Sequence, residues 1–198
     1  MALLLTQDKP LYEGKSCNYT ESLELVDDGF HYEIIEGVMS VVPAPLEKHQ
    51  DILGYIYVEL TNFLRQHPMG KVSLAPRDVK LAESLVYQPD LLFIAKERQT
   101  ISKPQYVDGS PDFIIEILSG ATLSRDTRIK FYDYEKYGVK EYWIVNPQDI
   151  KHSEFYSLEE NHYTPFDPEK NTIYSKVIIG FSLDLVALEK YHNPFYRP

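Results

Sequence analysis

One stretch, residues 111–147, constrains the fold of this chain more than any other. Its sequence, PDFIIEILSGATLSRDTRIKFYDYEKYGVKEYWIVNP, predicts a strand, a helix and a second strand. The apolar run from Phe113 to Leu118 is typical of a strand buried on both faces, yet Glu116 stands in its middle. Burying an unpaired carboxylate is so unfavourable that the group is normally neutralised, paired or bound to a cation. We therefore expect some partner to lie opposite Glu116.

The helix expected over residues 122–137 offers one candidate. Ser124 or Thr122 can cap its start and Gly138 can end it. Lys130 lies within the face expected to pack on the sheet, which also holds Leu123, Thr127, Phe131, Tyr134 and Tyr137. Taken alone, Lys130 could equally form a surface pair with Asp126, four residues earlier. Its position on the apolar face favours an approach to Glu116 instead.

A second acid precedes another strand. Gln88-Pro89-Asp90 leads into the apolar run Leu91–Ala95. A Pro-Asp pair at a strand start is by itself an ordinary turn signal. Two carboxylates on neighbouring strands, however, can hold a hard divalent cation, and a nearby lysine can orient or deprotonate water and offset phosphate charge. Asp90, Glu116 and Lys130 together predict a site for phosphodiester hydrolysis.

The order Pro89-Asp90, then Glu116, then lysine resembles the PD-(D/E)XK nuclease superfamily. Further segments make most of the chain similar to the Uma-type bacterial family of restriction endonucleases: residues 32–37, 49–50, 88–90, 111–119, Asp126 with Lys130, and 138–143. In the superfamily the lysine usually lies two residues after the acid, where this chain has Leu118. The resemblance implies that the lysine has moved to the next helix, as Lys130. The loop 119–122, Ser-Gly-Ala-Thr, departs from the family's usual sequence.

This resemblance implies an α/β, restriction-endonuclease-like fold and metal-dependent cleavage of DNA. The metal, Mg²⁺ or Mn²⁺, would be held by Asp90, Glu116 and the carbonyl group of Ile117. Lys130 would position or activate the attacking water. Accessory roles are expected for His49, Gln50 and Asp126, and phosphate contacts for Arg125 and Arg128. A packed, structural histidine is the alternative for His49, which lies on the inner face of a helix expected over residues 46–67.

The length of 198 residues, 43% of them hydrophobic, suits one domain. We expect a weakly ordered arm over residues 1–22, followed by a single domain over residues 23–198. That domain would contain a mixed sheet flanked by the two helices. A hairpin is expected over residues 29–42 with Gly37 at its turn, and within it Glu33 and Glu36 are interpreted as turn or edge residues. The segments between residues 152 and 188 predict an antiparallel extension of the sheet, whose tyrosines could form a homodimer surface.

Composition limits the function classes. The net charge of −10 argues against broad, sequence-independent adhesion to nucleic acid, so positive charge would have to be local. The single cysteine, the lack of a signal-peptide pattern and the lack of a long apolar run predict a cytoplasmic protein without membrane spans.

Two alternatives to the DNA nuclease remain open. Lys130 could merely neutralise the acids in a noncatalytic DNA-binding or assembly module, or the substrate could be RNA or another phosphodiester.

Overall fold

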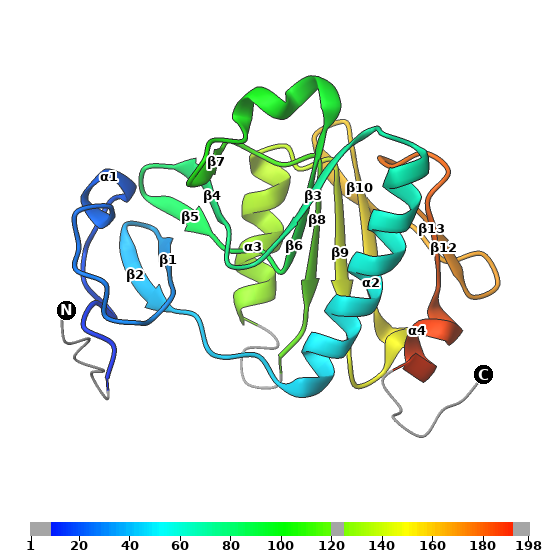
Figure 1. Cartoon of the computed structure of the whole chain (residues 1–198), viewed down its shortest axis with the longest axis horizontal. Helices are drawn as coiled ribbons and strands as arrows, with labels where there is room; N and C mark the ends of the chain where they lie inside the picture. The colour runs from blue at the N-terminus through cyan, green and yellow to red at the C-terminus, as the bar shows by residue number, and fades with distance from the viewer. Residues whose placement is uncertain (1–8, 120–124, 192–198) are drawn as a thin grey trace.

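A six-stranded mixed sheet forms the centre of the molecule (Figure 1). The computed structural model describes residues 9–119 and 125–191, with the side chains of residues 125–127 outside this description. Neighbouring strands follow the order β11-β10-β9-β8-β6-β3. Their bounds are β3 (Gly70–Leu74), β6 (Leu91–Ala95), β8 (Phe113–Ile117), β9 (Glu141–Val145), β10 (Glu154–Glu159) and β11 (His162–Pro165). Strands β8 and β9 are parallel, whereas β6 pairs antiparallel with β8, so the predicted mixed sheet is confirmed.

The strand-helix-strand unit predicted from residues 111–147 connects the two parallel strands. Helix α3 (Arg125–Lys136) crosses from β8 to β9 and packs Tyr134, which is fully buried, against the sheet. Gly138, with φ of 81°, follows the helix in the left-handed conformation that commonly ends one. The predicted residues 122–124 at the start of this helix lie outside the described residues.

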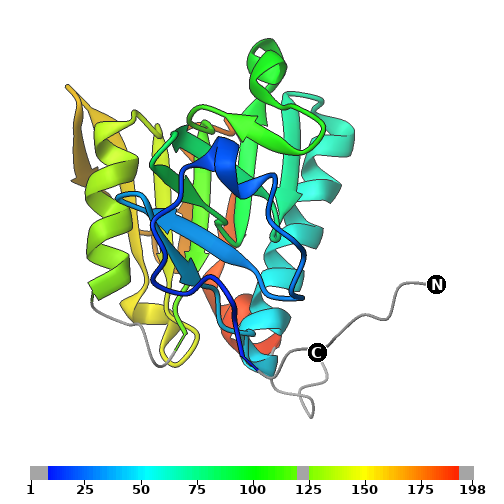
Figure 2. The same ribbon diagram turned by 90° about the vertical axis from the view of Figure 1, so that its left-hand side faces the viewer.

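Helix α2 (Glu47–Gln66) covers the opposite face of the sheet. Ile52, Ile56 and Leu60 recur at helical spacing and are fully buried in the core beneath it. Figure 2 shows the strands lying between α2 and α3. No helix among the described residues is long and apolar enough to cross a membrane.

The predicted hairpin is present, but it belongs to a second sheet that the sequence did not predict. Strands β1 (Tyr32–Ile35) and β2 (Val38–Val41) join through Glu36 and Gly37, which both have positive φ, as a tight hairpin turn requires. The second sheet has the order β2-β1-β5-β4-β7 and adds β4 (Asp78–Ala82), β5 (Leu85–Tyr87) and β7 (Tyr106–Asp108). A 3-10 helix (Lys96–Ile101) precedes β7.

The described part of the arm predicted to be weakly ordered packs against this second sheet. Cys17 and Tyr19 are buried, and helix α1 (Tyr19–Ser22) starts at a capping box of Asn18 and Glu21. The N–H of Cys17 donates to the carbonyl oxygen of Gly37 at 2.8 Å. The prediction was therefore wrong for this segment, because its apolar side chains and backbone donors find partners on the hairpin. Residues 1–8 lie outside the described residues.

The C-terminal region confirms the antiparallel extension in part. Strands β10 and β11 extend the sheet, but β12 (Thr172–Tyr174) and β13 (Ser182–Asp184) form a separate pair. From Leu185 the predicted extension is wrong, since helix α4 (Leu185–Tyr191) begins there. The Asp184 carboxylate accepts the N–H groups of Val186 and Ala187, which caps this helix. A second 3-10 helix (Ile150–His152) follows β9.

Gly70→Ala is expected to destabilise the protein because the backbones approach closely at the start of β3. A Cβ atom at Gly70 would lie 2.5 Å from the ring of Phe93 and closer still to the carbonyl oxygen of Ile94. Overpacking of this kind costs about 1–3 kcal/mol, which urea denaturation would measure. Gly54→Ala, on α2 with open space around it, is the control and should stabilise by about 0.5–1 kcal/mol. Equal stabilities for both variants would contradict this reading of Gly70.

Candidate active site

Strand pairing brings Asp90 and Glu116 together. Leu91 of β6 lies opposite Ile115 of β8, so the antiparallel register places Asp90, one step earlier, beside Glu116, one step later. The N–H of Ile117 donates to Asp90 Oδ2 at 2.7 Å. The two acids therefore meet at one end of the central strands, as the sequence predicted.

Lys130 reaches the same point from helix α3. Its Nζ lies 3.0 Å from Glu116 Oε1, and its side chain is only 15% exposed. The ammonium also lies over the ring of Tyr87, at 5.2 Å from the ring centre. The hydroxyl of Tyr134 donates to the same Glu116 oxygen at 2.9 Å. The alternative of a solvated surface lysine is thus excluded by the buried contact with Glu116.

Glu33 is a fourth charged member of this cluster, and its interpretation as a turn or edge residue was wrong. Its Oε1 lies 2.8 Å from Lys130 Nζ and accepts the N–H of Gln88 at 2.9 Å. The side chain is 11% exposed, so the carboxylate is paired rather than solvated. Glu33 stands in an apolar strand, which is the signal that singled out Glu116. Glu36, at the hairpin turn, is exposed.

The charges in this cluster are strongly coupled. The pKa of Glu116 is raised to about 7 overall: burial raises it most, Lys130 lowers it, and the nearby Asp90 and Glu33 raise it. Burial alone would lower the pKa of Lys130, but Glu116 and Glu33 raise it above its ordinary value. The two carboxylates therefore favour the protonated form of Lys130.

His49 contacts the other acid. Its Nε2 lies 3.1 Å from Asp90 Oδ2, and its side chain is 7% exposed. Burial lowers the pKa of His49, but the hydrogen bond and charge of Asp90 outweigh this effect and raise it overall. Within the described part of the chain, its buried Nδ1 has no hydrogen-bond partner. Gln50, beside it, is exposed and lines the same cavity as the acids.

The remaining predicted residues are less closely involved. Arg128 is exposed on α3 and is not among the described residues that line the cavity. Arg125 and Asp126 belong to α3, but their side chains lie outside the described residues. Asp112, just before β8, lies outside the cluster and pairs with Arg98 at 2.9 Å and Lys140 at 2.8 Å.

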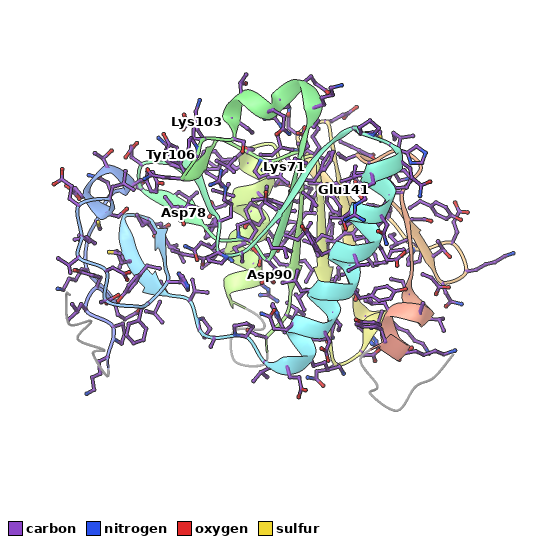
Figure 3. All side chains as sticks on the ribbon, viewed as in Figure 1. Lys71, Asp78, Asp90, Lys103, Tyr106 and Glu141 are labelled. Carbon is purple, nitrogen blue, oxygen red and sulfur yellow. The ribbon has the colours of Figure 1, made fainter. Side chains whose placement is uncertain are left out.

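A cavity of about 780 Å³ contains the cluster. Its walls include Glu33, His49, Asp90, Glu116 and Lys130, which come from both sheets and both large helices. In Figure 3 Asp90 lies low on the central strands, while Glu141 lies nearer their upper end. The candidate site is therefore confined to one end of the sheet.

The side chains at this end of the sheet have the chemistry that a hard divalent cation needs. Asp90 and Glu116 supply carboxylate oxygens. Among the described residues, Oδ1 of Asp90 and Oε2 of Glu116 have no hydrogen-bond partner. Such oxygens, with a backbone carbonyl group such as that of Ile117, are the ligands that Mg²⁺ and Mn²⁺ prefer. Across the described residues, no group of three or more His, Cys, Asp or Glu side chains is spaced to hold a metal. A cation here would need ligands beyond side chains.

The protein has an α/β, restriction-endonuclease-like fold, in which helices flank a mixed sheet. A crystal structure described as "a putative nuclease belonging to DUF820 from Anabaena variabilis ATCC 29413" shares the fold with a TM-score of 0.73 and 18% identity. The match covers 88% of this chain and 98% of that one. The sequence profile of the Uma2 family, described as "Putative restriction endonuclease", matches residues 19–186. The chain belongs to the Uma2 family. Among curated proteins no match was found.

Proposed function

We propose that this protein is a metal-dependent endonuclease that hydrolyses DNA phosphodiester bonds. The main support is the buried contact between the Lys130 ammonium and Glu116, in a cavity that also contains Asp90. Family membership and the nuclease fold agree with this reaction class. A structural salt bridge would need Lys130 and one acid, whereas here two carboxylates pair with Lys130 and a third, that of Asp90, lines the same cavity.

Each residue of the cluster has a defined task in this proposal. Asp90, Glu116 and the carbonyl group of Ile117 would hold Mg²⁺ or Mn²⁺. A divalent cation there supplies Lewis-acid polarisation of the phosphate and lowers the pKa of a bound water. Lys130, protonated because of its two carboxylate partners, donates hydrogen bonds to the phosphate or the water and offsets developing negative charge. It is thus an electrostatic and positioning group rather than the base.

The surrounding residues would support these tasks. His49 orients Asp90 through the Nε2 contact, and Glu33 keeps Lys130 charged and fixed. Gln50 is placed to contact substrate at the cavity wall. Arg125 and Arg128 would bind backbone phosphates outside the cavity, and Asp126 would have an accessory role. A homodimer and a cytoplasmic location also belong to this proposal.

Titration calorimetry with Mg²⁺ and Mn²⁺, combined with a DNA cleavage assay, tests it directly. The wild-type protein is expected to bind metal and to cut DNA only when metal is supplied. Asp90→Ala is expected to abolish both, because one carboxylate ligand is lost. Glu59→Ala, which removes an exposed carboxylate on α2 outside the cavity, is the matched control and should retain both. Absence of metal binding and cleavage in the wild-type protein would instead favour the noncatalytic module.

A further inference from the structure

The reactive groups line the cavity and are largely buried. The side chains of Asp90, Glu116 and Lys130 are 17%, 13% and 15% exposed. The segment Val42–Pro45, between β2 and α2, forms one wall, and its two prolines restrict its backbone. Phe30 and His31, just before β1, line another part of the wall. A phosphodiester must therefore enter this space before it can reach the acids.

The volume of the cavity limits what can enter. About 780 Å³ is within the range of pockets that enclose one small ligand. A nucleic-acid duplex is far larger and keeps its bases stacked inside, so its bulk would remain outside. An unpaired strand is thinner and more flexible than a duplex, so one of its phosphates can be carried inward to the acids. The dimensions thus favour a single strand over a rigid duplex.

The charge and chemistry of the walls agree with this selection. Of the described residues that line the cavity, the cationic or titratable bases are Lys130, His31 and His49, facing three carboxylates. This balance, in a chain with a net charge of −10, offers little attraction for the densely charged duplex backbone. The wall instead contains the partly exposed ring of Phe30 and the exposed ring of His31. Such rings bind unpaired bases by stacking.

We propose that this cavity takes a single unpaired polynucleotide strand, with Phe30 stacking on a base at its wall, and does not accept an intact duplex. Cleavage of that strand rests on the nuclease function proposed above, whereas its binding does not. DNA and RNA strands share the chemistry recognised here, namely an unpaired base and a phosphodiester.

The test compares a labelled single strand, the matched blunt duplex and the same duplex with an internal unpaired segment, each made as DNA and as RNA. Cleavage is followed in Mg²⁺ and Mn²⁺, and binding is followed separately by fluorescence anisotropy in Ca²⁺. We expect the single strand and the unpaired segment to be preferred over the blunt duplex by about tenfold or more in both measurements. Comparing the DNA and RNA versions identifies the preferred sugar.

Phe30→Ala is expected to weaken single-strand binding about tenfold, since it removes the stacking ring. Tyr174→Ala, which removes an exposed aromatic side chain on β12, is the control and should leave binding unchanged. Equal or better binding of the blunt duplex would overturn the inference, as would unchanged binding by Phe30→Ala. If no substrate is cleaved, the proposed nuclease function is contradicted. The anisotropy comparison still decides whether the cavity binds the single strand or the duplex.

Discussion

Replacing Lys130 with methionine is expected to lower the rate of DNA cleavage about 10²–10³-fold, the usual cost of removing one fixed electrostatic donor from an active site. Methionine keeps most of the length of the side chain but removes the ammonium that lies 3.0 Å from Glu116 and 2.8 Å from Glu33. The loss of this cation also removes the main influence that lowers the pKa of Glu116. The remaining activity should therefore shift toward higher pH, as a pH profile of the cleavage rate would show.

Two further variants separate catalysis from folding in this experiment. Lys136→Met removes a lysine in the last turn of the same helix, where the side chain is exposed, and should leave the rate unchanged. Lys130→Arg keeps the charge and should keep the fold, but its planar group cannot reproduce the same contacts, so the rate should be intermediate. Full activity in a folded Lys130→Met protein would remove Lys130 from the proposed reaction.

The three residues of the proposed site were predictable because two of them break a local pattern and the third, Asp90, gains meaning beside them. Glu116 interrupts an apolar strand, Asp90 opens a neighbouring strand, and Lys130 lies on the apolar face of the helix between β8 and β9. Once the strands pair, their register leaves little freedom in where these side chains meet. The chemistry of the site was thus encoded locally and assembled by regular secondary structure.

Glu33 was missed because its partner, Lys130, is distant in sequence. Glu33 belongs to the second sheet, whereas Lys130 lies on α3, which packs on the central sheet. Nothing in the sequence of the hairpin 29–42 indicates that Glu33 pairs with Lys130 of α3. The packed segment around Cys17 and Tyr19 was missed for the same reason, since its hydrogen bonds go to the hairpin and to Glu83. Helix α4 was missed because it is short, and a few apolar residues fit a strand and a short helix equally well.

Glu141 holds a buried network at the other end of the sheet. Its carboxylate accepts hydrogen bonds from Trp143 Nε1 at 2.8 Å, Ser175 Oγ at 2.7 Å, and the N–H groups of Lys176 at 3.0 Å and Val177 at 2.8 Å. The side chain itself is fully buried. This single carboxylate therefore attaches the segment between β12 and β13 to the central strand β9.

Glu141→Ala is expected to destabilise the protein by about 3–5 kcal/mol, among the largest effects of a single substitution. The substitution removes the acceptor that four donors share, and among the described residues only the Val177 N–H keeps a second acceptor, Ser175 Oγ at 3.2 Å. Each buried donor left unpaired costs about 1–3 kcal/mol before the structure relaxes. Urea denaturation followed by tryptophan fluorescence would measure the loss, since Trp143, one of the donors, is the only tryptophan.

The pH dependence of this loss gives an independent test. Burial raises the pKa of Glu141 to about 7 from the ordinary 4.5, although its hydrogen-bond donors lower it. A carboxyl group with a raised folded-state pKa contributes stability that is complete below the ordinary pKa and is lost as the pH rises through the folded one. Glu141→Ala should therefore cost more near pH 5 than near pH 8, by up to about 3 kcal/mol. Glu141→Gln cannot titrate, so its stability should lack this slope. A cost that instead grows with pH would mean that the four donors keep Glu141 ionised in the folded protein.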